Sequence, residues 1–169
     1  VYYATKELGF GRTQALNAVT VATVVATLLI PLMGALSDRI GRKTVYIAGV
    51  LMMMAYAFPY FWLLQTRSFS MLILATVIGL GVIWAPTTAV LGTMFSEIFK
   101  SNVRYTGITL GYQIGAALAG GTAPLVATFL LAKFDHSYVP IALYIIFTGL
   151  VSLVAIAAVS ERSGRQLDE

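Results

Sequence analysis

Residues 13–43 read TQALNAVTVATVVATLLIPLMGALSDRIGRK, and this stretch decides the fold class. Positions 13–37 contain no charged residue. A helix rises about 1.5 Å per residue, so this segment is long enough to cross a hydrocarbon core about 30 Å thick. Charged residues follow at once, beginning with Asp38 and Arg39. The pattern predicts a transmembrane helix that ends in a charged turn at the membrane surface.

The composition of the whole chain points to the same environment. Of 169 residues, 59% are hydrophobic and only 11% are charged, whereas soluble domains carry about a quarter charged residues. The net charge of +4 is spread along the chain, and a nucleic-acid surface needs clustered basic residues. The absence of cysteine excludes disulfides and thiolate-bound metals. We therefore expect an integral membrane protein that has the lipid bilayer as a partner and binds no nucleic acid.

Four further uncharged stretches are also long enough to span a bilayer. None of them shows the alternation of a transmembrane β-strand. The sequence thus predicts an all-α membrane protein with five complete transmembrane helices, at residues 13–37, 44–66, 68–96, 105–132 and 137–160. Residues 1–12 are expected to form the end of an earlier helix and an outer loop, so the chain looks like part of a longer protein. Residues 161–169 are expected to form a cytoplasmic tail.

The basic residues indicate which way the chain crosses the membrane, because Lys and Arg near span ends are retained in the cytoplasm. Seven lie on one side: Arg39, Arg42, Lys43, Lys100, Arg104, Arg162 and Arg165. Four lie on the other: Lys6, Arg12, Arg67 and Lys133. We expect the C-terminus to be cytoplasmic.

Residues 34–43, GALSDRIGRK, resemble the signature loop of the major facilitator superfamily, G-x-x-x-D-R-x-G-R-[RK]. By themselves, these residues predict a close helix approach at Gly34, an anion at Asp38 that can face another helix N-terminus, and a tight turn at Gly41. Arg39, Arg42 and Lys43 would anchor the turn at the anionic cytoplasmic surface. The alternative is an ordinary basic cytoplasmic loop, which explains the charges but not the spacing of both glycines.

The resemblance implies that the chain is the C-terminal six-helix bundle of that fold, with residues 1–10 as the stub of helix seven and the five spans as helices eight to twelve. Its partner would be an N-terminal half of the same transporter. The substrate cavity of such folds lies between the two bundles near the bilayer midplane. This chain would then supply one wall of the cavity.

Residues 95–107, FSEIFKSNVRYTG, are similar to the E-x-F-P-x-x-V-R-x-x-G stretch between helices ten and eleven of sugar porters and metabolite:H+ symporters. Lys100 replaces the usual proline. The R-Y-T-G ending and the LGYQ that follows look more like the metabolite:H+ symporter family, which carries organic acids, shikimate, proline and betaine. Sugar porters usually end their last helix with P-E-T-K-G, whereas residues 160–165 read SERSGR.

In the first span, Asn17, Thr20, Thr23 and Thr27 fall on one arc of about 120° at about 100° per residue. This polar stripe is our first candidate for the cavity wall. A threonine in a membrane helix often bonds only its own backbone carbonyl, so a structural role is the alternative for each one. The amide of Asn17 needs partners outside its helix, either another helix or a solute.

The third and fourth spans offer further cavity candidates. Trp84 lies in mid-span beside Pro86, which removes a backbone hydrogen bond and can kink the helix. The Trp84 side chain could either pack against a neighbouring helix or contact the solute, and the sequence does not decide between these two roles. Thr76, Thr87 and Thr88 share its arc, and Tyr112 and Gln113 are candidates in the fourth span. The same span carries a small-residue ridge, typical of close helix packing, at Gly107, Gly111, Gly115 and Ala119.

The family resemblance also implies a cytoplasmic ionic network that latches helix ends during alternating access. Its residues would be Asp38, Arg39, Arg42, Glu97 and Arg104, together with Gly34, Gly41 and Lys43 of the turn. A solvated surface whose ion pairs contribute little is the alternative.

No Asp, Glu, Lys or Arg lies inside any predicted span. A proton symporter needs such a buried ionisable group, so the carrier is expected in the other half. His136 is expected to be a solvated residue outside the cytoplasm, with a pH-sensing role left open. We expect no catalytic residue, no cofactor and no metal site.

The sequence therefore predicts the C-terminal half of a secondary transporter for a small polar or anionic metabolite, coupled to H+, in the bacterial inner membrane. A sugar-porter-like facilitator and a non-transporting receptor or scaffold on the same fold are the alternatives. A membrane enzyme is disfavoured, because the single histidine lies on the side opposite the charged loops.

Overall fold

A computed structural model describes residues 1–98 and 104–158, and every regular element in these two ranges is a helix. The elements are α1 (Tyr2–Lys6), α2 (Arg12–Ile40), α3 (Arg42–Gln65), α4 (Phe69–Thr76), η1 (Val77–Ile83), α5 (Trp84–Ile98), α6 (Arg104–Gly115), η2 (Ala116–Gly120), α7 (Gly121–Lys133) and α8 (Val139–Ala158). Five helices are long and apolar enough to cross a membrane: Arg12–Ile40, Arg42–Gln65, Phe69–Met94, Tyr105–Lys133 and Val139–Ala158. This confirms the predicted all-α membrane fold class.

Two of these five helices contain a π-helical segment. In the third span, η1 joins α4 to α5, and in the fourth, η2 joins α6 to α7. A π segment widens the helix by one residue per turn and often lies at a functional site. The sequence analysis predicted a bend near Pro86 but no change of helix type.

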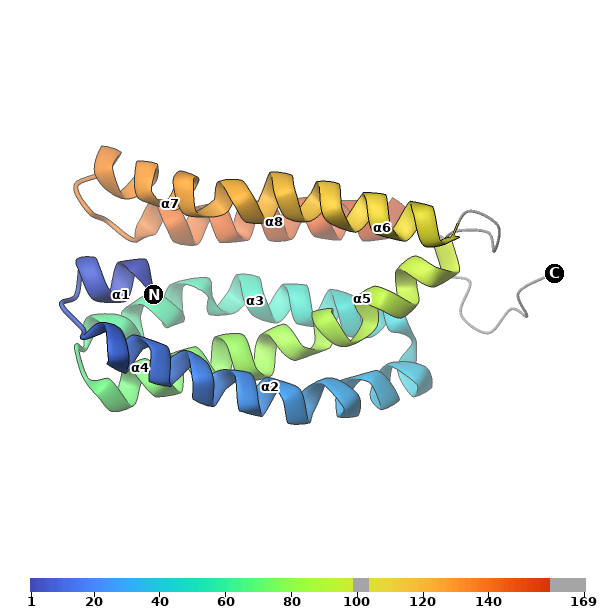
Figure 1. Cartoon of the computed structure of the whole chain (residues 1–169), viewed down its shortest axis with the longest axis horizontal. Coiled ribbons are helices and arrows are strands. Elements are labelled where there is room, and N and C mark those ends of the chain that lie inside the picture. The colour runs from blue at the N-terminus through green and yellow to red at the C-terminus, as the bar shows by residue number, and fades with distance from the viewer. Residues whose placement is uncertain (99–103, 159–169) are drawn as a thin grey trace.

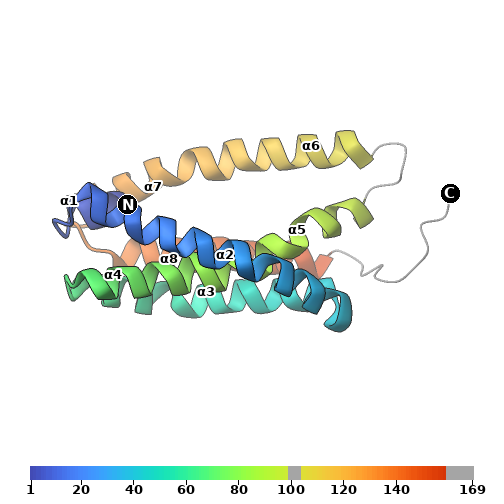
Figure 2. The same ribbon diagram turned by 60° about the horizontal axis from the view of Figure 1, so that its bottom comes forward.

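The helices α2, α3 and the α4–η1–α5 span pack side by side, and α8 lies against α3 (Figure 1). Helix α2 contacts this group through one stripe of buried small residues, Ala15, Ala18, Ala22 and Ala26. The α6–η2–α7 span stands apart from α2 and α3 for most of its length (Figure 2). It approaches the others near its two ends, where α6 contacts α5 and α7 contacts α8.

Three glycines mark the closest approaches between helices. A Cβ on Gly49 of α3 would lie 2.8 Å from Thr87 Cγ2, and one on Gly81 of η1 would lie 3.1 Å from the carbonyl oxygen of Ala22. A Cβ on Gly149 of α8 would lie 2.5 Å from Cγ of Met54. A side chain at any of these positions would require a neighbouring atom to move.

The main hydrophobic core lies at the end of the molecule where α1 is found. Its buried members come from six helices and the turn after α1: Ala4, Phe10, Ala18, Ala57, Phe61, Leu64, Leu72, Leu131, Ile141 and Ala142. The ring of Phe61 stacks on Tyr138 with centroids 5.4 Å apart and meets Tyr3 edge-on at 5.3 Å. This core fixes α1 and the α7–α8 turn to the bundle.

At the opposite end, α2 and α3 are joined by one residue. Gly41 ends α2 and begins α3 with φ 95° and ψ 136°, and its N–H donates to the carbonyl of Ser37 at 3.0 Å. A residue with a side chain rarely adopts this φ, so the glycine makes the turn possible. Because α2 continues to Ile40, Asp38 and Arg39 belong to its last turn and not to a loop.

Candidate functional site

The polar stripe predicted for the first span lies on the exposed side of α2. Asn17, Thr20 and Thr23 are all exposed. At about 100° per residue, Asn17 and Thr20 point away from the buried alanine stripe and Thr23 lies to one side of it. Thr20 and Thr23 donate their hydroxyls to the carbonyls of Leu16 and Val19, at 3.0 and 2.8 Å. Thr27 does the same to the carbonyl of Thr23, at 2.8 Å.

These bonds use the donor of each threonine and leave its oxygen able to accept one more hydrogen bond. Asn17 differs, because its amide makes no hydrogen bond to any residue that the structure describes. An amide has four hydrogen-bonding positions to fill. Of the α2 candidates, Asn17 therefore has the greatest capacity to bind a polar solute.

The candidates of the third span divide into exposed and packed residues. Trp84 keeps 45% of its surface exposed. Thr87 is half-buried, its hydroxyl donates to the carbonyl of Trp84 at 2.8 Å, and its methyl group faces Gly49. Thr76 is buried and donates to the carbonyl of Leu72 at 2.7 Å. Thr87 thus contributes to the contact between α5 and α3, a role that the sequence did not reveal.

Two tyrosines of α3 lie against the π segment of the third span. The Tyr56 hydroxyl donates to the carbonyl of Ala75 at 3.3 Å, and the Tyr60 side chain interacts with Thr76. Gly79 lies opposite both rings, and a Cβ there would be 3.5 Å from Tyr56 and 3.7 Å from Tyr60. These contacts hold the start of η1 beside α3. These contacts could not be predicted from the sequence, because contacts between spans leave no local pattern.

Most residues of the fourth span, α6–η2–α7, are exposed or only partly buried. Tyr112 and Gln113 are exposed, as are the ridge residues Gly111, Gly115 and Ala119. No atom lies within 4 Å of where a Cβ on Gly111 or Gly115 would be. Gly111 and Gly115 of the predicted packing ridge therefore have no close neighbour among the described residues of this chain.

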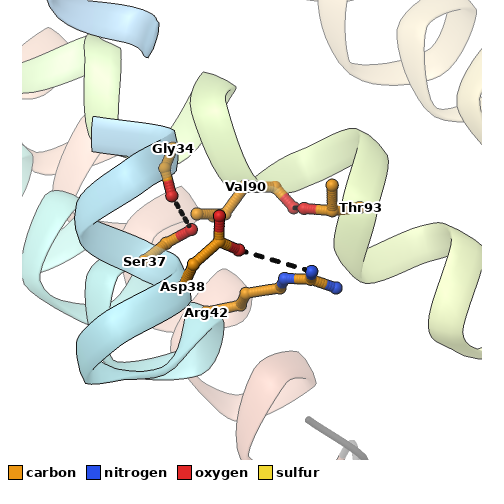
Figure 3. A network of polar contacts seen from close by, with 6 residues as sticks. All are labelled: Gly34, Ser37, Asp38, Arg42, Val90 and Thr93. Atoms are coloured by element: carbon orange, nitrogen blue, oxygen red, sulfur yellow. Dashed lines mark hydrogen bonds and ion pairs between the residues drawn. The ribbon is translucent and has the colours of Figure 1, made fainter. Parts of the chain in front are cut away.

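The predicted turn between the first two spans brings together several polar groups at the end of α2 (Figure 3). Arg42 Nη2 lies 3.5 Å from Asp38 Oδ1 across Gly41. Lys43 Nζ donates to the carbonyl of Ala157 at 3.4 Å, so a cation of α3 lies at the C-terminal end of α8. A cation is stabilised there by the helix dipole. The turn thus links α2, α3 and α8 at one membrane face.

Ser37, and not Gly34, is the residue with a buried side chain in this region. Ser37 is buried and donates its hydroxyl to the carbonyl of Gly34 at 2.7 Å. No atom lies within 4 Å of where a Cβ on Gly34 would be, so the close approach predicted for Gly34 is not found within the described chain. Arg39 makes no ion pair with any described residue. The side chains of Glu97 and Arg104 lie outside the part of the chain whose side chains are described.

At the other end of the bundle, the structure brings together two ionisable residues that the sequence did not connect. His136 Nδ1 lies 2.9 Å from Glu7 Oε2. Glu7 follows α1 and His136 lies in the turn between α7 and α8. His136 is two-thirds exposed, as predicted for a solvated residue, but its partner carboxylate is largely buried.

The sequence that forms these spans and the turn matches a known protein family. Residues 1–166 match the model of the Major Facilitator Superfamily. The chain belongs to the major facilitator superfamily. This confirms the family predicted from the motif at residues 34–43 and places the chain among transporters and not among enzymes.

Similar members of the superfamily are bacterial metabolite transporters. The chain is 31% identical to the shikimate transporter of Escherichia coli strain K12 over 150 residues, which cover 89% of this chain and 34% of that protein. It is 32% identical over 168 residues to the ectoine/proline transporter ProP of Corynebacterium glutamicum, covering 98% of this chain and 32% of ProP. It is 29% identical over 134 residues to the citrate-proton symporter of Klebsiella pneumoniae, covering 79% of this chain and 30% of that symporter.

This superfamily chain therefore spans about a third of the length of these relatives. They belong to the metabolite:H+ symporter group, as the residues at 104–113 predicted. No solved structure gives a significant match.

Proposed function

We propose that this chain is the C-terminal half of a proton-coupled transporter that moves a small polar or anionic metabolite by alternating access. The whole transporter would enclose a cavity between this half and an N-terminal half. The substrates named for the relatives are shikimate, ectoine or proline, and citrate. All of these are small and polar and carry a carboxylate, and small carboxylates are the substrate class we propose here.

The observation that carries this proposal is the exposed polar side of α2. Its buried alanine stripe packs on the third span, while Asn17 and Thr20 point away from that stripe and Thr23 lies to one side of it. A purely lipid-facing surface would have no use for an amide that lacks a partner. We propose that this side of α2 lines the cavity, together with Trp84, Thr88, Tyr112 and Gln113.

The proposed orientation has the α2–α3 turn and the C-terminus in the cytoplasm, because seven basic residues lie at that face and four at the other. The α7–α8 turn then lies outside the cytoplasm. Since the relatives are bacterial, we propose the plasma (inner) membrane as the location. The Asp38–Arg42 pair and the Lys43 contact to α8 would form part of a cytoplasmic latch, with Arg39, Glu97 and Arg104.

Proton coupling would depend mainly on the other half. No acidic or basic residue lies within residues 13–37, 44–66, 68–96, 105–132 or 137–160. An ionisable group in the membrane interior is the usual proton carrier of a symporter. We therefore propose that this carrier lies in the N-terminal half.

Uptake by the complete transporter in proteoliposomes tests the proposal. The assay uses organic acids, amino acids and betaines, with and without an imposed inward pH gradient. Uptake of at least one of these classes, stimulated by the gradient, is expected. Hexose exchange that does not respond to the gradient would favour a sugar facilitator, and lack of uptake for every solute would contradict the proposal.

Substitution on α2 tests the cavity wall separately. Asn17→Leu is expected to raise the KM for the substrate about tenfold or more, because loss of one hydrogen bond to a charged group costs about 1.5–3 kcal/mol. Leu32→Ala is the matched control, since Leu32 is 61% exposed and lies about 120° around the same helix from the centre of the polar stripe. Equal effects of the two substitutions on KM would show that Asn17 does not face the solute.

A further inference from the structure

The structure places a largely buried carboxylate at the end of the bundle where α1 lies. Only 17% of the Glu7 side chain is exposed. Its backbone N–H donates to the carbonyl of Tyr3 at 3.0 Å, and Tyr3 in turn lies near Tyr138 and the Gln65 side chain. A carboxylate with so little access to water needs a polar partner, and His136 supplies it at 2.9 Å.

The turn that presents His136 is held by its own backbone. Asp135 and His136 both have positive φ, 48° and 62°, which is unfavourable for residues other than glycine. The His136 N–H donates to the carbonyl of Leu131, and the Ser137 N–H donates to the carbonyl of Phe134, both at 2.9 Å. Leu131 is itself buried in the core beneath. These backbone hydrogen bonds hold the turn in the conformation that directs the imidazole toward Glu7.

The geometry assigns a different role to each ring nitrogen. Nδ1 lies 2.9 Å from Glu7 Oε2, and an ionised carboxylate can only accept, so Nδ1 carries a hydrogen and donates it. Nε2 is then the nitrogen that can bind a second proton. Two-thirds of the His136 side chain is exposed, so that proton can come from water. Once bound, it gives the donor a positive charge, so that the hydrogen bond to the carboxylate becomes an ion pair and is strengthened by the attraction between opposite charges.

The other titratable groups around the pair leave this assignment intact. Tyr3 and Tyr138 face it from α1 and from the start of α8. Asp135 precedes His136 in the turn, and Lys6 precedes Glu7 at the end of α1. Lys133 ends α7, where its ammonium lies 5.7 Å from the centre of the Phe129 ring. His136 is the one histidine of the chain, and imidazole is the side chain whose charge ordinarily changes between pH 5 and 8.

The pair acts at the place where the fourth span is attached. In the described part of the chain, the α6–η2–α7 span contacts the other helices near its two ends, and the α7 end is the one joined to α8 and to the core. Figure 2 shows this end beside α1, while α6 stands away from α2. A stronger contact between Glu7 and His136 therefore restrains the α7 end of the α6–η2–α7 span, which is where this span is attached to the bundle.

We propose that Glu7 and His136 form a proton-binding pair, which clamps the α7–α8 turn onto α1 more tightly when the imidazole is protonated. The proposal goes beyond the transport function and needs neither the substrate nor the proton carrier. With the orientation proposed above, the pair faces the compartment outside the cytoplasm and responds to its pH. Acidification outside the cell would then stiffen the outer attachment of α6–α7.

Hydrogen-exchange mass spectrometry on the complete transporter in lipid nanodiscs tests this pair without relying on transport. Peptides covering residues 1–10 and 131–139 are compared between wild type and His136→Gln at the same pH, so that the intrinsic pH dependence of exchange cancels. Glutamine retains one neutral donor but cannot bind the proton. At pH 6 we expect these peptides to exchange about tenfold faster in His136→Gln than in wild type, because the charged pair is lost. At pH 8.5 the difference should fall below about threefold.

Two further variants make the test specific. Glu7→Gln should remove the same pH-dependent protection, whereas Asp135→Asn is the matched control and should keep it. Asparagine tolerates the positive φ at position 135, and the substitution removes a charge beside His136 without removing the pair. If the exchange rates of wild type and His136→Gln differ equally at both pH values, the contact is a hydrogen bond that does not depend on protonation, and the proposal is overturned. Absence of any difference at pH 6 would show that the pair does not form.

Discussion

Replacing Gly49 by alanine should force α3 and α5 apart. A Cβ at this position would lie 2.8 Å from Thr87 Cγ2, 3.2 Å from Pro86 Cβ and 3.3 Å from the Thr87 backbone nitrogen. Ordinary contact between carbon atoms is about 3.5–4.0 Å. The Thr87 side chain cannot rotate away without breaking its hydroxyl bond to the carbonyl of Trp84, and Pro86 is rigid and buried. The helices themselves must therefore separate locally by roughly 1 Å to restore ordinary contact.

The expected cost follows from two opposing terms. Overpacking of this kind costs about 1–3 kcal/mol, and alanine in place of a helical glycine returns up to about 1 kcal/mol. Gly49→Ala should thus lower the free energy of unfolding by about 1–2 kcal/mol. Gly92→Ala on α5 is the matched control, because no atom lies within 4 Å of its Cβ position. That control should be neutral or slightly stabilising.

Thermal unfolding of the detergent-solubilised complete transporter measures both variants. The shift in midpoint per kcal/mol falls as a protein grows, so for a protein about three times as long as this chain the midpoint of Gly49→Ala should lie about 1–2 °C below that of Gly92→Ala. Adding Thr87→Ser to Gly49→Ala removes the clashing methyl and keeps the hydroxyl, so it should recover at least half of the loss. Equal midpoints for the two alanine variants, or no recovery with serine, would refute the close approach of α3 and α5.

Three further predictions concern other contacts of the bundle. Gly41→Ala places a side chain at φ 95° and should destabilise the α2–α3 turn by about 1–3 kcal/mol; an unchanged unfolding midpoint would mean that the turn has another conformation. Tyr56→Phe removes the hydroxyl bond to the carbonyl of Ala75 and should cost about 1 kcal/mol, with faster hydrogen exchange in residues 75–83 but not in α8. Asp38→Asn should change the unfolding free energy by less than about 0.5 kcal/mol, because its ion pair is exposed. The same substitution should reduce uptake at least tenfold. If the amount of folded protein falls in proportion to uptake, Asp38 has a structural role instead.

The fold class was predictable because its signal lies within single segments. Five apolar stretches free of charge define five spanning helices, since backbone groups in lipid must be bonded within the segment. The turn at Gly41 was predictable for the same reason, because the glycine and its flanking charges are contiguous. The preference of threonine for its own helix carbonyls was one of the two alternatives, and the hydroxyls of Thr20, Thr23 and Thr27 follow it.

What the sequence did not reveal depends on residues far apart in the chain or on small changes of backbone geometry. Glu7 and His136 belong to opposite ends of the described chain, and no periodicity connects them. The π segment η1 differs from an α-helix by one residue per turn, and Gly79 and Gly81 are compatible with either. The role of Thr87 arises only because Gly49 of another helix lies against it.

The glycines of these spans fall into two groups: some lie against a neighbouring helix of this chain, and others have no close neighbour in it. Gly49, Gly81 and Gly149 have no repeating spacing, yet a Cβ on each would lie within 3.1 Å of a neighbouring helix. Gly111 and Gly115 have the spacing typical of close helix approach, yet nothing lies within 4 Å of their Cβ positions. Spacing indicates that a backbone can be approached closely, but not which chain approaches it. Because this chain covers about a third of its relatives, we expect the partner of α6 in the part of the transporter that the chain does not include.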